Sequence, residues 1–473
     1  MKKSILFLIS AFVLAFAVSC GDDDSKQGTA ISVSFANQSA NLTDGGIPVQ
    51  ILFSEAAPSA GQVTVQLAGT NVAYGTDFTT TPTATGNTVV VPFQAGAKQV
   101  SFTIKNVAPL TEEQIGSVTF TIASVSVNAN ITGITSTVVN FYEAPSSGNS
   151  LAAETGGPTQ MNQVYVDLSS GGLISVPRVS WDLAFYSGSD HFRLELNGSL
   201  KMTAKALATT NIDEVAQQDD SMLFGQGSGT AAYVDDPSGD ITKTAIQEVS
   251  AIDSENPVYL INLGNGPAET APAVGSEGSA GGAQRGWKKV RILRSGNDYV
   301  FQYADLNATT HQEVTISKNA AYNFTFFSFT SNAVVQAEPQ KNLWDLNFTT
   351  FTNFVATGTG NVPYYFADFI VTNLKGGARS YEVLTEEFTY AGFTKSNVVE
   401  GKFTEDQRNI GSNWRSTSVV GPDGFPVSQF VLKTDRFYVI KDPAGNYYKL
   451  KMTQGANQAG ERGFPKFEYA LLN

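Results

Sequence analysis

The sequence predicts an almost entirely β-structured protein, and three observations support this. Short runs of alternating apolar and polar residues, rich in Val, Ile, Thr, Phe and Tyr, recur along most of the 473 residues. Turn residues separate these runs, and helical periodicity is scarce, with 213–218 the best short helix candidate. The length allows about two or three domains. We therefore expect an all-β chain with an N-terminal immunoglobulin-like β-sandwich followed by a larger, mostly antiparallel β domain.

Composition excludes several classes of function. Charged residues make up only 15% of the chain and the net charge is −13, so nucleic acid would be repelled unless a basic patch intervened, and none is visible. One Cys and two His exclude a disulfide scaffold and a Cys/His zinc cluster. We expect no metal site and no nucleic-acid partner.

The first 19 residues have the pattern of an export signal. Lys2 and Lys3 precede an apolar run over 5–18, which is too short for a comfortable transmembrane helix. The run ends just before Cys20, the single cysteine, and resembles a bacterial lipoprotein signal in which Cys20 is lipidated. Ordinary signal-peptidase cleavage nearby is the alternative. The lipid would then be the membrane anchor.

An acidic spacer follows over 20–29. Asp22, Asp23 and Asp24 resemble the signal by which Bacteroidetes-type bacteria export lipoproteins to the outer face of the outer membrane, although a solvated spacer is the bland alternative. The resemblance implies a lipid-anchored outer-membrane protein that faces the cell exterior.

Residues 30–143 contain about seven short strand patterns, which suits one sandwich domain. The runs at 74–78 (YGTDF) and 91–104 (VPFQAGAKQVSFTI) resemble the Calx-beta group of immunoglobulin-like modules. Members of that group can bind calcium through clustered carboxylates. Here Asp77, Glu112 and Glu113 are the plausible remnants, so a spacer role is the stronger expectation.

Small polar residues over 144–157 indicate a linker, and we place the second domain at 158–473. Its strand patterns are rich in aromatic residues. Residues 295–298 (SGND) predict a hairpin turn, and the low-complexity stretch 275–286 predicts a surface loop.

One phrase occurs twice in the second domain, as WDLAF at 181–185 and WDLNF at 344–348. A strand ending in Asn and Gly follows each copy. Alternation along a strand sends Trp, Leu and Phe to one face and Asp to the other, so we interpret Trp181 and Trp344 as core residues.

At these residues the chain resembles the HmuY-like family of Bacteroidetes surface lipoproteins, whose best-known members bind haem. The resemblance extends to 436–453 and 460–472, which are similar to that family's closing hairpin. It implies capture of haem or a related tetrapyrrole for uptake, with an outer-membrane transporter as a possible partner. The family's ligand segment corresponds to 414–428, which contains no His and no Met.

Haem iron takes its axial ligands from His, Met, Cys or Tyr. The candidate ligand-binding residues are His191, His311, Tyr364, Tyr365 and Trp414. His191 does not match a family ligand position, and His311 suits an exposed turn. The aromatic side chains at 364–366 and Trp414 could hold a porphyrin by stacking on its faces.

Two functions stay open on the sequence alone. The first is capture of haem or a related tetrapyrrole, with haem as the cofactor-like ligand. The second is a non-haem surface module that binds glycan or protein, or serves as an accessory to an outer-membrane complex. We expect no enzyme, because the phosphate-loop, HExxH and GxSxG patterns are missing. Asp190 and His191 would point to opposite faces of an extended strand and would form no dyad.

Overall fold

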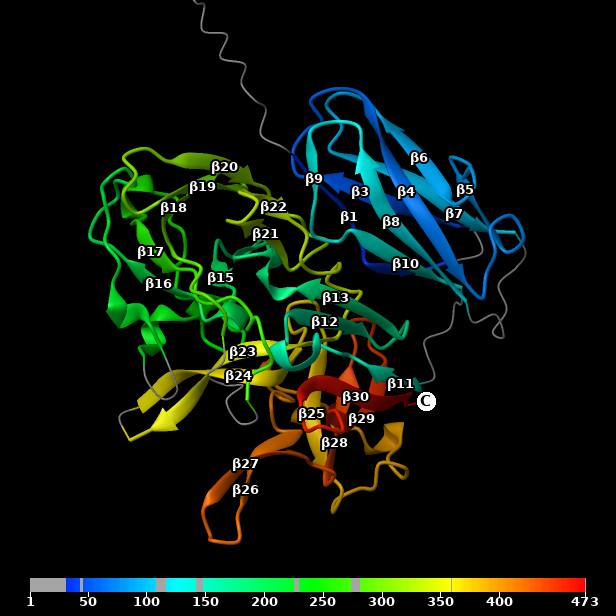
Figure 1. The fold of residues 1–473 in the computed structure, drawn as a ribbon, viewed down its shortest axis with the longest axis vertical. Helices are drawn as coiled ribbons and strands as arrows, with labels where there is room; N and C mark the ends of the chain where they lie inside the picture. The colour runs from blue at the N-terminus through cyan, green and yellow to red at the C-terminus, as the bar shows by residue number, and fades with distance from the viewer. Residues whose placement is uncertain are drawn as a thin grey trace, which may run out of the picture.

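The computed structural model describes residues 31–42, 46–107, 116–141, 148–224, 229–273, 281–358 and 360–472. These residues form β-strands and three-residue 3-10 helices, which confirms the all-β prediction (Figure 1). The described part of the chain has no helix with the length and apolar character needed to cross a membrane. The 3-10 helices are η1 (Gly157–Thr159), η2 (Arg178–Ser180), η3 (Gly198–Leu200), η4 (Asp220–Met222), η5 (Ala231–Tyr233), η6 (Ile241–Lys243), η7 (Asp253–Glu255), η8 (Lys395–Asn397) and η9 (Glu400–Lys402).

The N-terminal module is the predicted sandwich of two five-stranded sheets. One sheet has the order β5-β7-β3-β1-β9 and the other β2-β10-β8-β4-β6. The strands are β1 (Ile31–Phe35), β2 (Ser39–Asn41), β3 (Ile47–Phe53), β4 (Gly61–Thr70), β5 (Phe78–Thr81), β6 (Thr88–Phe93), β7 (Gln99–Asn106), β8 (Ser117–Val125), β9 (Ala129–Ile131) and β10 (Ser136–Asn140). Alternate residues point inward, and rings such as Phe102 and Phe120, 4.8 Å apart, join the sheets in one core.

The second domain consists of antiparallel sheets. A five-stranded sheet has the order β11 (Gly148–Ala152), β30 (Arg462–Leu471), β29 (Tyr447–Ala456), β28 (Arg436–Lys441), β25 (Arg379–Leu384). Another has the order β16 (Thr203–Ala206), β17 (Tyr259–Asn262), β18 (Trp287–Ser295), β19 (Asp298–Ala304), β20 (Gln312–Ile316). The predicted turn at 295–298 joins β18 to β19, with Ser295 opposite Asp298.

Two four-stranded sheets lie in the middle of the domain. We name them sheet D, with the order β13 (Gly172–Pro177), β12 (Asn162–Asp167), β23 (Leu346–Thr357), β24 (Gly360–Thr372), and sheet E, with the order β15 (Leu194–Leu196), β14 (Leu183–Tyr186), β21 (Phe324–Ser328), β22 (Ala333–Val335). A separate two-stranded hairpin is formed by β26 (Arg415–Val420) and β27 (Pro426–Leu432).

Sheets D and E show that the two copies of the repeated phrase exchange hairpins. Strand β14, which follows the first Trp-Asp, pairs with β21, a strand far along the chain. In this pairing Leu183 lies opposite Phe327. The strand after the second Trp-Asp, β23, pairs in the same way with β12, at Leu346 opposite Val166. Each hairpin therefore completes the sheet that belongs to the other copy.

The expected linker at 144–157 is partly a strand. Residues 148–152 form β11 and pair with β30, with Leu151 opposite Phe467. The sandwich also contacts the second domain directly, because the Tyr322 hydroxyl donates to the Ala36 carbonyl. Polar composition therefore did not separate a linker from an edge strand, since an edge strand also tolerates polar residues.

The short helix expected at 213–218 is wrong. The Asn211 side chain accepts a hydrogen bond from the Asp213 amide, and the Ala216 amide donates to the Leu306 carbonyl. A helix that began at residue 213 would bond the Ala216 amide internally, whereas here that amide makes a long-range contact, and six residues are too few to form a stable helix alone. Of the loop expected at 275–286, residues 275–280 lie outside the described residues, and Gln284 forms a β-bridge with Asn265.

Candidate functional site

The two Trp-Asp pairs have matching backbone contacts. The Asp182 carboxylate accepts the amide of Phe329, just beyond β21, at 2.7 Å. The Asp345 carboxylate accepts the amide of Leu168, just beyond β12, also at 2.7 Å. Both carboxylates are buried. The Asp of each phrase therefore binds the end of the hairpin that the other copy supplies, which fixes the hairpin exchange.

The Asn residue that follows the next strand in each copy also makes the same contact in both copies. Asn197 donates to the carbonyl of Trp181 at 2.9 Å, and Asn373 donates to the carbonyl of Trp344 at 2.8 Å. Both Asn side chains are buried. The Asn after each Trp-Asp phrase thus belongs to one local structure that occurs twice, although it lies 16 residues after Trp181 and 29 residues after Trp344.

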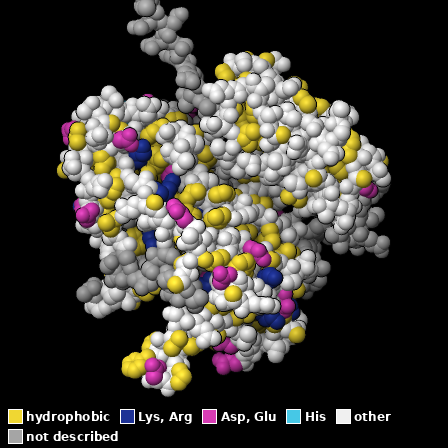
Figure 2. Space-filling model, in the orientation of Figure 1, with side chains coloured by type: hydrophobic (Ala, Val, Ile, Leu, Met, Phe, Trp, Pro, Cys, Tyr) yellow, Lys and Arg dark blue, Asp and Glu magenta, His cyan; other side chains and the backbone are white. Residues whose placement is uncertain are grey.

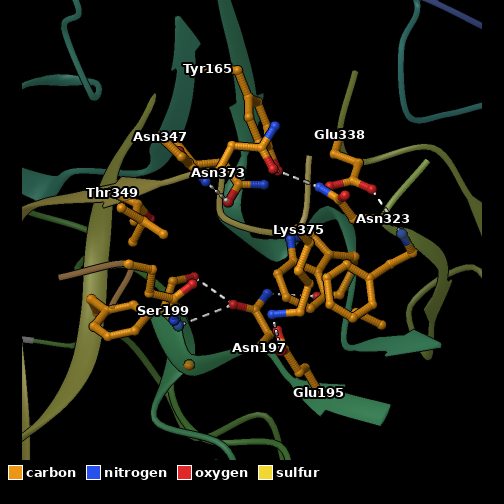
Figure 3. Close-up of a pocket in the computed structure, with 18 of the residues that line it drawn as sticks. Tyr165, Glu195, Asn197, Ser199, Asn323, Glu338, Asn347, Thr349, Asn373 and Lys375 are labelled. Carbon is orange, nitrogen blue, oxygen red and sulfur yellow. Dashed lines mark hydrogen bonds and ion pairs between the residues drawn. The ribbon is translucent and has the colours of Figure 1, made fainter. Parts of the chain in front are cut away.

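A cavity lies between sheets D and E, where the two copies meet. It has about 120 Å³ of free space, and the residues that line it come from both copies (Figure 3). One wall, from sheet D, carries Gln163, Tyr165, Asn347 and Thr349. This wall is polar. The facing wall, from sheet E and the residues before it, carries the following apolar side chains: Trp181, Ala184, Phe324 and Phe326.

Residues that line the cavity carry buried polar atoms that have no hydrogen-bond partner in the described part of the chain. They comprise three nitrogens and two oxygens: Trp181 Nε1, Trp344 Nε1, Gln163 Nε2, Asn323 Oδ1 and Asn347 Oδ1. A buried polar group without a partner usually destabilises a fold by about 1–3 kcal/mol. A concentration of such atoms around one cavity is therefore a candidate binding site.

Charged groups at the cavity are largely neutralised. Lys375 pairs with Glu195 at 2.8 Å, and both side chains are partly exposed. Glu338 is buried, and this desolvation raises its pKa to about 8, although the amides of Phe324 and Asn323 oppose the shift. Glu338 is therefore mainly uncharged at neutral pH.

The two histidines lie in separate ionic clusters outside this cavity. His191 Nδ1 lies 3.3 Å from Glu248, which also binds Arg193. His311 Nδ1 lies 2.8 Å from Asp213. Each ring is only partly exposed, and each already has a carboxylate neighbour. The structure does not bring His191 and His311 together.

The aromatic candidates are also divided. Tyr364 is half-buried on β24 and contacts Phe366, with ring centroids 4.9 Å apart. Tyr365 is buried on the opposite face of the strand, with the Lys201 ammonium 4.5 Å from its ring centre. Trp414 is 1% exposed and packs against Phe430 in the core. Tyr364 is therefore the aromatic candidate that is available to a ligand.

Two hairpins project from the domain, and β24 of one of them carries Tyr364 (Figure 1). They are β23–β24 and β26–β27, and they share a base, where the Arg415 guanidinium donates to the Ala367 carbonyl. The tip of β26–β27 is apolar and open to solvent, with Val420 77% and Phe425 69% exposed, and Figure 2 shows this apolar tip at the bottom of the molecule. Exposed apolar side chains gathered on one element indicate a contact surface.

The remaining sequence candidates are only partly described. Cys20, Asp22, Asp23 and Asp24 lie outside the described residues, as do Glu112 and Glu113 of the first module. Asp77 is described, and its carboxylate accepts the Ala73 amide at 2.7 Å. Across the described ranges no three His, Cys, Asp or Glu side chains gather as a metal site would.

The family model for the HmuY protein matches residues 159–316 and 320–469. The chain belongs to the HmuY family. The matched HmuY region begins at η1, ends within β30 and includes both Trp-Asp phrases, so the resemblance seen in the sequence is confirmed.

The solved structures to which this HmuY-family chain is similar have low TM-scores and low sequence identities. A protein of Bacteroides vulgatus described as HmuY-like and heme-binding has a TM-score of 0.17 and 8% identity, covering 68% of this chain and 91% of that one. The apo form of the Calx CBD1 domain has a TM-score of 0.20 and 14% identity, covering 24% and 95%. The CBD12 segment of CALX1.2 has a TM-score of 0.21 and 12% identity, covering 31% and 70%. No curated protein matches the chain.

The cavity between the HmuY repeats is the site that sequence reasoning missed. The repeated Trp-Asp phrase was visible, but both Trp residues were interpreted as core. Trp344 is indeed buried at 7% exposure, and Trp181 is partly buried. The missing information was the pairing of distant hairpins, because that pairing brings the two Trp residues to one cavity.

Proposed function

We propose that this HmuY-family protein captures haem or a related tetrapyrrole at the cell surface and passes it to an outer-membrane transporter. Membership of the HmuY family is the observation that carries the proposal. The role is binding, with no catalytic step.

The proposed contact surface consists of aromatic side chains on the two projecting hairpins. Tyr364 and Phe366 offer half-buried aromatic faces on β24, and Phe425 offers an exposed ring on the β26–β27 hairpin. Flat apolar macrocycles stack on such faces. The phenol of Tyr364 supplies an oxygen of the type that ligates haem iron in some haem proteins. By contrast, the cavity between the repeats is smaller than the roughly 300–1,000 Å³ of ordinary cofactor pockets.

Haemin titration followed by the Soret band tests this proposal. We expect Tyr364→Phe to weaken haemin binding at least tenfold and to change the band position, because iron would lose an oxygen ligand. Tyr365→Phe is the matched control, since its ring is buried on the other face of the same strand. His191→Ala and His311→Ala should bind haemin as the wild type does. No Soret band with the wild-type protein would refute the proposal.

A non-haem role in glycan or protein contact is the second candidate. It is favoured by the absence of His and Met over 414–428 and by the exposed Val420 and Phe425 at the hairpin tip. In that case haemin would give no specific band, and Phe425→Ser would abolish partner binding while the melting temperature stays unchanged.

We also propose that Cys20 carries the lipid that holds the protein at the outer membrane. Cys20→Ala should release the protein from the membrane fraction, because no other anchor is expected. Replacing Asp22, Asp23 and Asp24 by Ala should keep the protein acylated but shield it from protease added to intact cells. Detergent-dependent fractionation of Cys20→Ala would contradict the lipid assignment.

A further inference from the structure

The cavity between sheets D and E has two chemically different walls. The sheet E side presents aromatic faces, with Trp181 and Phe326 in edge-to-face contact at 5.0 Å and Phe324 beside them. The sheet D side presents amide side chains, including Gln163 and Asn347. A ligand that suits both walls has an apolar face and a rim of hydrogen-bonding groups.

The unpaired atoms specify the hydrogen bonds of that ligand. The ring nitrogens of Trp181 and Trp344 can only donate, so they require acceptors on the ligand. Asn347 Oδ1 and Asn323 Oδ1 accept, so they require donors. Trp344, Asn347 and Asn323 are each more than nine-tenths buried. Hydroxyl groups satisfy both kinds of partner, because each hydroxyl donates one hydrogen bond and accepts others.

The charges around the cavity favour an uncharged ligand. The ammonium of Lys375 is already bound by Glu195 at 2.8 Å and by the carbonyl of Gly239 at 3.0 Å. Glu338 is buried and accepts a hydrogen bond from the amide of Phe324 at 2.9 Å, and Figure 3 shows it beside Asn323. A charged ligand would lose its hydration without gaining a free counter-charge, which is strongly unfavourable.

We propose that the cavity between the two repeats binds a small, uncharged, hydroxylated molecule of monosaccharide size. The free space of about 120 Å³ is below the roughly 300–1,000 Å³ of ordinary ligand pockets, which limits the ligand to a small molecule of this kind. Lys375 and Glu195 also line the cavity, and both side chains are partly exposed. This site is separate from the hairpin surface proposed for a tetrapyrrole.

Calorimetric titration with matched sugars tests the proposal on the full chain. The neutral probes are D-glucose, D-galactose and N-acetyl-D-glucosamine, and the charged counterparts are glucosamine and glucuronate. We expect at least one neutral probe to bind with a dissociation constant in the millimolar range or below. The charged counterparts should bind at least tenfold more weakly, because the cavity offers them no free counter-charge.

Variants locate the binding. The double variant Trp181→Phe/Trp344→Phe keeps the aromatic packing and removes both ring donors, so sugar affinity should fall at least tenfold. Asn347→Leu should have a similar effect through loss of an acceptor. Trp287→Phe is the control, because Trp287 lies in a different cluster with Met222 and Leu260. Each variant's melting temperature is measured alone and with sugar, so that a loss of stability is separated from a loss of binding.

Three outcomes would overturn the proposal. These are no binding of any neutral probe, unchanged binding in the Trp and Asn347 variants, and a crystal structure grown with the sugar in which ordered water alone fills the cavity. Haemin titration of the double variant is independent of all three, because Tyr364 is untouched. Absence of the Soret band with a wild-type protein that does bind sugar would refute the tetrapyrrole proposal and leave this one standing.

Discussion

The two Trp-Asp repeats have the same hydrogen bonds but different charges around the central Asp. Asp182 is fully buried and pairs with Arg285, whose side chain is 14% exposed. Asp345 is also buried, but its charged neighbours are Asp167 and Asp442. Burial and these two acids raise the pKa of Asp345 well above its ordinary value. The repeat therefore reproduces a backbone geometry and leaves the protonation of the Asp to local surroundings.

This difference shows what the motif does. Both carboxyl groups accept a hydrogen bond from a backbone amide at 2.7 Å, so this hydrogen bond is the function that the two repeats share. A neutral carboxyl group still accepts that amide, while an ion pair adds stability only where a cation is at hand. The ion pair with Arg285 is therefore specific to the first repeat.

The largest expected effect is on the two Trp residues. Trp344→Ala should lower the free energy of unfolding by about 3–5 kcal/mol, because a buried indole and its contact with Tyr165 at 4.9 Å are lost. Trp181→Ala should lower it by about half as much, since Trp181 is only partly buried. Urea unfolding of both variants measures the comparison. Equal losses would mean that Trp181 and Trp344 are packed to the same extent, despite their different exposures.

The next effect concerns the paired Asn residues. Asn197→Ala and Asn373→Ala should each lower the free energy of unfolding by about 2–3 kcal/mol, because each leaves buried carbonyls without donors. Thermal unfolding of the two variants side by side provides the measurement. A much smaller loss for one of them would break the equivalence of the repeats at this position.

The smallest effect is a difference in pH dependence. Above the ordinary Asp pKa of about 4, unfolded Asp345 loses its proton while the folded form keeps it, so rising pH lowers the stability of the wild type through this group. Asp345→Asn removes that loss, so the stability of the variant relative to the wild type should increase from pH 5 to pH 8. Urea unfolding at both pH values gives the comparison.

Asp182→Asn is the matched control for that experiment. It weakens the bond to Arg285 and should lower the free energy of unfolding by about 2 kcal/mol at both pH values. If Asp345→Asn shows the same constant loss, the carboxyl group of Asp345 is charged in the folded protein and the proposed contrast fails.

The sequence predicted local structure well and long-range pairing poorly. Alternation identified the strands of the sandwich, and the repeated phrase at 181–185 and 344–348 identified equivalent units. Alternation states which face a residue occupies, but it does not name the partner strand. The exchange of β12 and β21 between repeats, and the cavity that results, therefore had no sequence signal.

The same limit explains two individual residues. Trp414 follows a polar stretch and seemed available to a ligand, yet it is 1% exposed because β27 places Phe430 against its ring. Leu151 lies in a stretch whose composition suits a linker, yet β30 supplies its partner strand. In both cases a residue distant in sequence decides the environment.

The exchanged hairpins have a kinetic consequence. Strand β12 pairs with β23, which lies about 180 residues later in the chain, and β11 pairs with β30, the last strand. Topologies with such distant contacts fold slowly, and strands that wait for partners are prone to aggregation. During synthesis the sandwich can fold early, whereas the HmuY-family domain cannot complete its sheet until β30 has been made. A chain truncated before β30 should therefore be a substrate for chaperones and proteases, whatever ligand the complete protein binds.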